Sequence, residues 1–110
     1  VTKEDRPWFV GAKAYQRATL KSFSKKNEYS KNNITFNSIS PGPLLIPDTG
    51  WHKLLKKSPR KYLKLINQIP AERIGKPADV ANACLFLCSK YASYINGVDL
   101  FVDGGKINKI

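Results

Sequence analysis

The sequence has no methionine, only two cysteines and a single histidine among its 110 residues. Two cysteines are too few for a disulfide scaffold, and His52 has no neighbouring cluster of cysteines or carboxylates that would make it a metal ligand. No apolar run approaches the ~18 residues that a membrane-spanning helix needs, and no N-terminal secretory signal is visible. These absences predict a cytoplasmic chain with no membrane partner and no metal. The missing methionine and the start at Val1 predict that the chain was processed or cut from something longer.

Acidic residues are also scarce, because 8 Asp and Glu stand against 19 Lys and Arg and give a formal net charge of +11. Neither residues 6–27 nor residues 49–71 contain an acid. The second stretch interleaves its cations with Trp51 and Tyr62, an arrangement that can bind nucleic acid by phosphate neutralisation and base stacking. Two solvated helix faces explain the same pattern, and lysine offers no bidentate readout of bases. With four arginines and no usual recognition motif, nucleic-acid binding ranks as the least favoured hypothesis.

Helices are expected over residues 10–30, 51–57 and 59–66, and again from Pro77, a residue type that suits the first turn of a helix. The last of these shows the clearest periodicity, with apolar residues at helical spacing: Val80, Ala83, Cys84, Leu87, Cys88 and Tyr91. Further apolar residues lie between them, so this helix is expected to be buried on more than one side. Its two cysteines are then interpreted as small buried side chains and not as a redox pair.

Two strands are expected, at residues 33–40 and 98–102, the first closed by a turn at residues 41–43. Because helices separate them, the strands should run parallel with a right-handed crossover. A parallel sheet is normally covered on both faces, and one neighbouring strand and one helix cannot shelter Leu100 and Phe101. The pattern therefore predicts an α/β fold and the edge of a larger doubly wound parallel sheet.

Several segments resemble the short-chain dehydrogenase/reductase family, in particular its 3-oxoacyl-carrier-protein reductases, in the family's order and spacing. They are Asn33-Ile-Thr-Phe-Asn-Ser-Ile-Ser-Pro-Gly-Pro43, Arg73-Ile-Gly-Lys-Pro-Ala-Asp-Val-Ala-Asn82, Ala92-Ser-Tyr-Ile-Asn-Gly-Val98 and Val102-Asp-Gly-Gly105. The resemblance covers essentially the whole chain. It implies that residues 1–110 are the C-terminal half of a Rossmann-like domain whose glycine-rich dinucleotide loop, catalytic serine and asparagine are not in this sequence. It also implies NAD or NADP as cofactor, a small alcohol or carbonyl substrate, and a homo-oligomer.

The same resemblance assigns an active-site lysine to Lys13. In the family a tyrosine stands four residues earlier and exchanges a proton with the substrate, while the lysine lowers the pKa of the phenol and hydrogen-bonds the nicotinamide ribose. Here that position is Phe9, and the position seven residues before Lys13, used in a related enoyl-reductase pattern, is Arg6. Three explanations stay open: an engineered change, a natural non-catalytic relative, or a proton supplied from elsewhere, such as Tyr15 or a water.

A nicotinamide contact is implied by the same resemblance after the first strand. Pro41 and Gly42 match the turn that lets the backbone approach the nicotinamide, and the backbone of Leu44 would hydrogen-bond its carboxamide. Ile46 replaces a common threonine, which weakens a pyrophosphate contact, and residues 48–66 correspond to the segment that covers the substrate. The leading hypothesis is an NAD(P)-dependent oxidoreductase that interconverts alcohols and carbonyls. The alternative is a non-catalytic binding or oligomer-assembly module that keeps the fold.

Overall fold

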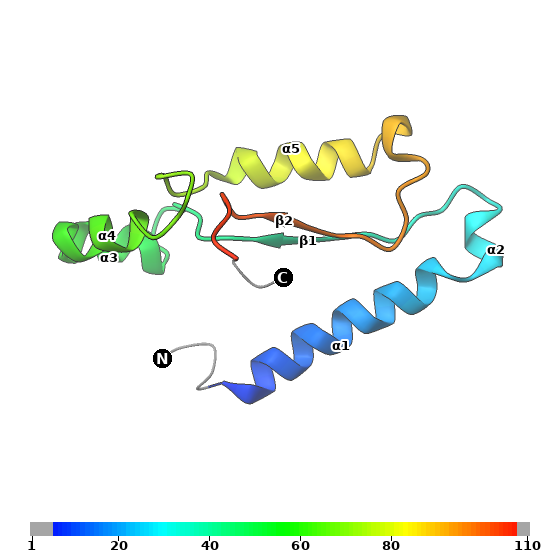
Figure 1. Cartoon of the computed structure of the whole chain (residues 1–110), viewed down its shortest axis with the longest axis horizontal. Helices are drawn as coiled ribbons and strands as arrows, with labels where there is room; N and C mark the ends of the chain where they lie inside the picture. The colour runs from blue at the N-terminus through cyan, green and yellow to red at the C-terminus, as the bar shows by residue number, and fades with distance from the viewer. Residues whose placement is uncertain (1–5, 108–110) are drawn as a thin grey trace. The chain divides into compact units, whose positions relative to one another are not determined.

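The computed structural model describes residues 6–107. Its elements in chain order are α1 (Pro7–Ser24), α2 (Asn27–Ser30), β1 (Ser38–Pro41), α3 (Gly50–Lys57), α4 (Pro59–Ile66), α5 (Pro77–Leu87), the short 3-10 helix η2 (Lys90–Ala92) and β2 (Asp99–Val102) (Figure 1). The chain divides into two compact units, Val1–Ser38 with Leu87–Leu100 and Ile39–Phe86 with Phe101–Ile110. None of the helices between residues 6 and 107 has both the length and the apolarity to cross a bilayer.

Strands β1 and β2 are neighbours in a two-stranded sheet (Figure 1). The backbone N–H of Ser38 donates to Val98 O at 2.9 Å, and the N–H of Gly42 donates to Val102 O at 2.9 Å. Residue numbers rise together along both strands, so the pair is parallel. Leu44 and Gly75 form a further isolated parallel bridge. The expected α/β fold with parallel strands is confirmed.

The first strand is shorter than expected and lies later in the chain, at residues 38–41 instead of 33–40. Side-chain amides replace ladder hydrogen bonds in the segment before it. Asn96 Oδ1 accepts the N–H of Phe36 at 2.9 Å, and Asn37 Oδ1 accepts the N–H of Val98 at 3.0 Å. The turn expected at residues 41–43 is also wrong, because Pro41 ends β1, Gly42 continues its hydrogen bonding, and the chain turns at residues 47–49.

The helix expected over residues 10–30 is in fact two helices, because α1 ends at Ser24 and α2 begins at Asn27. Ser24 Oγ donates to Lys21 O at 2.7 Å, a local bond that competes with continued helix. Lys26 then adopts an extended backbone, with φ −81° and ψ 117°. In contrast, α3 and α4 match the two basic helices expected from the sequence to within one residue.

Each unit has its own small core. In the second unit Tyr62, Ile66 and Ile69 are buried, and they are covered by partly buried side chains: Leu45, Trp51, Leu54, Leu55 and Ile74. In the first unit the rings of Phe23, Tyr29 and Phe36 form a cluster, with centroids 5.2 to 5.9 Å apart. The two helices α3 and α4 therefore bury their apolar sides and turn their cations outward.

Helix α5 forms where the periodicity predicts it, but it is not buried on several sides. Its half-buried face is narrow and consists of Val80, Ala83 and Leu87. Leu85 is 70% exposed, and Phe86, Cys84 and Cys88 are exposed as well. The interpretation of the cysteines as buried side chains is therefore wrong, because the elements that the structure describes form no second layer over that side of the helix.

Candidate functional site

The first turns of α1 place a half-buried aromatic ring beside two cations. Pro7 occupies the start of the helix, where its missing N–H costs nothing. Phe9 and Lys13 are one helical turn apart, and Lys13 Nζ lies 5.7 Å from the centroid of the Phe9 ring. Arg6 Cζ approaches the same ring at 5.5 Å. Spacing alone predicts the pairing of Phe9 with Lys13 on one helix face, and the geometry agrees.

The chemistry of this pair is limited by the missing hydroxyl. Two nearby cations favour the ionised form of a phenol, so they would lower the pKa of a tyrosine at position 9. Phe9 offers only its ring and can neither donate nor accept a proton. Lys13 Nζ is exposed and donates to Gln16 Oε1 at 3.3 Å, which leaves the ammonium further donors for a ligand.

Tyr15 is placed away from this pair. It borders a hollow of about 360 Å³ on the flank of α1, together with Gln16, Thr19, Leu20, Phe23 and Phe36. Neither Phe9 nor Lys13 lines that hollow. The structure therefore does not bring the Tyr15 hydroxyl together with Lys13, as a substitute proton donor would require.

In the second unit, the chain after β1 is fixed by close backbone packing. A Cβ added at Gly42 would lie 2.7 Å from Asp103 Cα, so only glycine fits between these two segments. Gly75 N–H donates to Pro43 O at 3.0 Å, and Leu45 N–H donates to Gly75 O at 2.9 Å. These bonds hold residues 43–45 extended beyond the end of the strand.

The backbone amide of Leu44 is left unused by this pairing. In a parallel bridge the partner strand bonds the residues on either side, and here these are Pro43 and Leu45. Within residues 6–107 the Leu44 N–H makes no hydrogen bond, and the residue is half-buried. A half-buried free donor at the carboxyl end of a strand is suited to a ligand's carbonyl oxygen.

An ion pair that sequence reasoning missed braces the same segment. Arg73 holds both carboxylate oxygens of Asp79, at 2.9 and 3.1 Å, and the N–H of Lys76 donates to Asp79 Oδ2 at 2.7 Å. The hydrogen bonds from Arg73, and then from Lys76, lower the pKa of Asp79 to about 2. The sequence shows only that Asp79 lies in the first turn of α5, where the helix dipole favours an acid. The clasp fixes the loop that carries Gly75.

The single histidine has a structural role in a turn. His52 Nδ1 accepts the backbone N–H of Asp48 at 3.1 Å, and Asp48 has a positive φ of 61°. Across residues 6–107, no group of three His, Cys, Asp or Glu side chains is arranged to hold a metal ion.

The basic stretch at residues 49–71 does not offer its aromatic rings to a ligand. Tyr62 is 8% exposed, and its ring meets that of Trp51 edge to face with centroids 6.5 Å apart. Lys106 Nζ covers Trp51 at 5.3 Å from the ring centroid. Tyr62 is therefore too buried to stack on a base, and Trp51 is half-buried with one face of its ring occupied by Lys106.

The predicted site residues fall into two groups. Phe9 and Lys13 belong to the first unit and contact one another, whereas Pro41, Gly42 and Leu44 belong to the second unit and share one strand end. Each group is a partial site within its own unit.

Known proteins with similar sequence or structure agree with one family. A family model described as Enoyl-(Acyl carrier protein) reductase matches residues 2–106. Isoepoxydon dehydrogenase patN of Penicillium expansum is 40% identical over 72 residues, which cover 66% of this chain and 28% of that protein. L-sorbose reductase from Gluconobacter frateurii, complexed with NADPH and L-sorbose, aligns with a TM-score of 0.72 and 33% identity, covering 89% of this chain and 39% of that one.

A third relative combines cofactor binding with an unusual site. The NADPH-bound short chain oxidoreductase from Pseudomonas aeruginosa PAO1, described as containing an atypical catalytic center, aligns with a TM-score of 0.75 and 26% identity, covering 91% of this chain and 38% of that one. The curated relatives are longer proteins, of which this chain spans 28% to 32% in the examples of patN and a 2,4-dienoyl-CoA reductase. Because the family model spans nearly all of the sequence, this chain belongs to the short-chain dehydrogenase/reductase family.

Proposed function

We propose that residues 1–110 are the C-terminal half of a Rossmann-like domain. This domain serves nicotinamide-dependent oxidoreduction, which is the interconversion of an alcohol and a carbonyl compound. The single observation that carries the proposal is the pairing of Lys13 with an aromatic ring one helical turn before it. Family membership and the NADPH bound by the L-sorbose reductase and the Pseudomonas aeruginosa oxidoreductase support it. This chain covers 39% and 38% of the lengths of these two proteins, which supports the proposal that it is half of a domain.

The residues present fit a nicotinamide cofactor, NAD or NADP. The free N–H of Leu44 would donate to the carboxamide oxygen, with Pro41 and Gly42 setting the path of the backbone before it. The ammonium of Lys13 has donors to spare for a ribose hydroxyl. When bound, the cofactor supplies the hydride or receives it.

Proton transfer is the step for which Phe9 provides nothing. Lys13 and Arg6 surround a ring that has no hydroxyl, so a substrate oxygen at this position would have to exchange its proton with solvent. We therefore propose that the chain binds the cofactor and supports little turnover. The atypical catalytic center described for the Pseudomonas aeruginosa relative supports cofactor binding in this family by a protein with an unusual site.

The intact mass of the polypeptide isolated from its source is measured first. The substitution Phe9→Tyr, made in a polypeptide of that length, then tests this account. The introduced phenol should titrate below its ordinary pKa of about 10, because Lys13 and Arg6 favour phenolate. Adding Lys13→Met should raise that pKa again. Turnover of secondary alcohols with NAD and NADP should appear in Phe9→Tyr and be absent from Phe9→Tyr/Lys13→Met. An acidified phenol without any gain in turnover would contradict the lost-hydroxyl account.

Exposed apolar side chains favour a second candidate, a non-catalytic module for binding or homo-oligomer assembly. Leu85, Phe86 and Phe101 are all exposed on regular elements, and such side chains, gathered into one patch, would suit a contact with another chain. An intact mass near 12.4 kDa, together with sedimentation as a stable oligomer, supports this alternative. A larger natural polypeptide that binds NADPH supports the oxidoreductase.

A further inference from the structure

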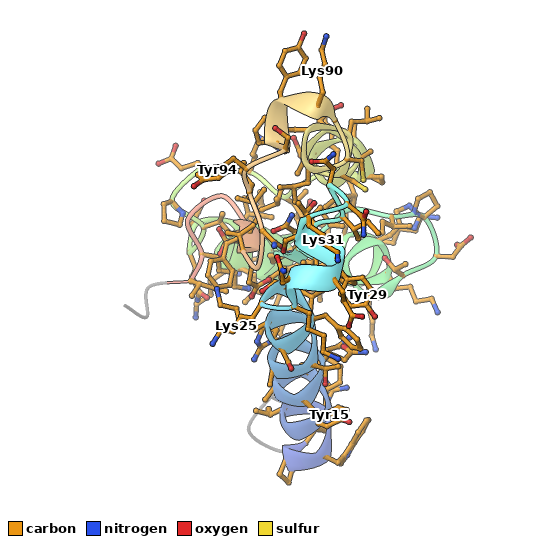
Figure 2. The ribbon with its side chains drawn as sticks, turned by 90° about the vertical axis from the view of Figure 1, so that its right-hand side faces the viewer. Tyr15, Lys25, Tyr29, Lys31, Lys90 and Tyr94 are labelled. Carbon is orange, nitrogen blue, oxygen red and sulfur yellow. The ribbon has the colours of Figure 1, made fainter. Side chains whose placement is uncertain are left out.

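The surface around the junction of α1 and α2 combines free cations with an exposed tyrosine ring. We name it the lysine–tyrosine face, and it consists of the exposed residues Lys25, Lys26, Lys31 and Tyr94. Tyr94 is fully exposed, which is unusual for a large aromatic side chain. Lys25, Lys31 and Tyr94 lie on the side of the first unit that faces the viewer in Figure 2, whereas Lys90 lies apart from them at the top of the view.

Hydrogen bonds hold the two segments of this face together. Asn96 Nδ2 donates to Ser24 O at 2.8 Å and to Ser30 Oγ at 3.3 Å. Lys21 Nζ donates to Gly97 O at 3.0 Å. The loop that carries Tyr94 is thereby fastened to the helices beside Lys25 and Lys31. The face is preformed, which lowers the ordering cost of binding a ligand.

The lysines of this face form no ion pair with the described residues of the fold. The ion pair formed in the described part of the chain, Arg73 with Asp79, lies in the other unit. Lys26 Nζ lies 4.8 Å from the Phe23 ring, a contact that leaves ammonium protons available. The helix dipoles account for cations at the ends of α1 and α2, but not for the fully exposed ring of Tyr94.

We propose that the lysine–tyrosine face binds single-stranded nucleic acid. Ammonium groups neutralise phosphates without regard to sequence, and exposed rings stack on unpaired bases. A duplex keeps its bases stacked internally and would leave Tyr94 without a role, and none of the three cations is an arginine that could read base edges. The lysines of the face precede β1 in the chain and Tyr94 precedes β2, and none of these residues is among those proposed to contact the nicotinamide.

The stacking contribution is tested with the 110-residue chain and labelled oligouridylate and oligothymidylate of about 12 nucleotides, by fluorescence anisotropy. The single strands should bind more tightly than a duplex of the same length. Tyr94→Ala should weaken single-strand binding on the order of tenfold, and Tyr94→Phe should preserve it, because stacking needs the ring and not the hydroxyl. The side chain of Tyr94 projects into solvent, so circular dichroism should show unchanged helix content in both variants.

The charge contribution is tested by salt dependence. Lys25→Gln/Lys31→Gln should reduce the slope of log affinity against log salt by about 0.7 for each phosphate that is no longer neutralised. The matched control is Lys53→Gln/Lys56→Gln on α3, which removes equal charge from a surface without exposed rings and should leave the slope unchanged.

Four results would overturn the proposal. They are equal affinity for duplex and single strand, unchanged binding in Tyr94→Ala, an equal loss in the α3 control, and displacement of the strand by saturating NADPH, which would move the binding to the cofactor site. Binding of the chain to anionic phospholipid vesicles, sensitive to Tyr94→Ala and without any binding of oligonucleotide, would assign the face to a membrane surface instead.

Discussion

Two basic surfaces of this molecule carry similar charge and place their aromatic rings in opposite ways. On α3 and α4 the cations point to solvent while Tyr62 is buried beneath them against Trp51. On the lysine–tyrosine face the cations and the ring of Tyr94 are exposed together. The sequence offers the same mixture of lysine and aromatic residues in both places. What differs is the side of the helix or loop on which each ring lies. A ring on the inner side becomes a core residue, and a ring on the outer side is a candidate for ligand binding.

The largest expected effect comes from exchanging one tyrosine of each surface for alanine. Tyr62→Ala removes a buried ring from the core of the second unit and should lower the free energy of unfolding by about 3 kcal/mol or more. Tyr94→Ala removes an exposed ring and should change it by no more than about 0.5 kcal/mol. Urea denaturation followed by circular dichroism measures both. Equal destabilisation by the two substitutions would remove the distinction between the surfaces.

The next effect concerns the residue that fastens the lysine–tyrosine face. Asn96 makes three hydrogen bonds, to Ser24 O, Ser30 Oγ and the N–H of Phe36. Asn96→Ala should cost about 2 kcal/mol, because these partners lose an amide in a partly buried place. Hydrogen exchange of the Phe36 amide should accelerate with it. Asn67→Ala, at an exposed position after α4, is the matched control, and it should leave this amide unaffected.

The fold was predictable where local pattern decides it. Proline positions and helical spacing locate α3, α4 and α5, and the same spacing places Phe9 beside Lys13. The start of β1 was not predictable, because Asn96, sixty residues later in the chain, takes the hydrogen bond of Phe36. A local pattern carries no information about such a partner.

The site was predictable only through the residue types that it requires. A lysine one turn after an aromatic ring can be read from the sequence, whereas the unused N–H of Leu44 follows from a bridge to Gly75 thirty-one residues away. The exposure of Cys84 likewise depends on which elements cover α5. The helix breaks between α1 and α2 at Lys25 and Lys26. The sequence does not predict this break, because no glycine or proline lies there.

A smaller effect would sharpen the charge half of the comparison. Lys53 and Lys57 are like charges one turn apart on α3, with no acid between residues 49 and 71. Lys53→Glu converts the repulsion into an attractive pair in the favourable order and should stabilise the chain by about 0.5 kcal/mol. The gain should fade in high salt. If Lys53→Glu instead destabilises the chain, the outward cations of α3 make a contact that supports the fold.

The smallest effect concerns the paired charge that both basic surfaces lack. Arg73 and Lys76 lower the pKa of Asp79 to about 2 from its ordinary value of 3.8, so the folded chain binds fewer protons than the unfolded chain between these values. Stability should therefore be fully present above about pH 4 and decline as the pH falls toward 2. Asp79→Asn keeps an acceptor for the N–H of Lys76 and removes the titrating group, so its stability should vary less across this window. Parallel urea titrations of the two proteins measure the difference. Identical pH profiles would mean that the ion pair of Arg73 with Asp79 contributes nothing to the stability of the fold. Arg73 would then add no more stability than the cations on the surface of α3 and α4.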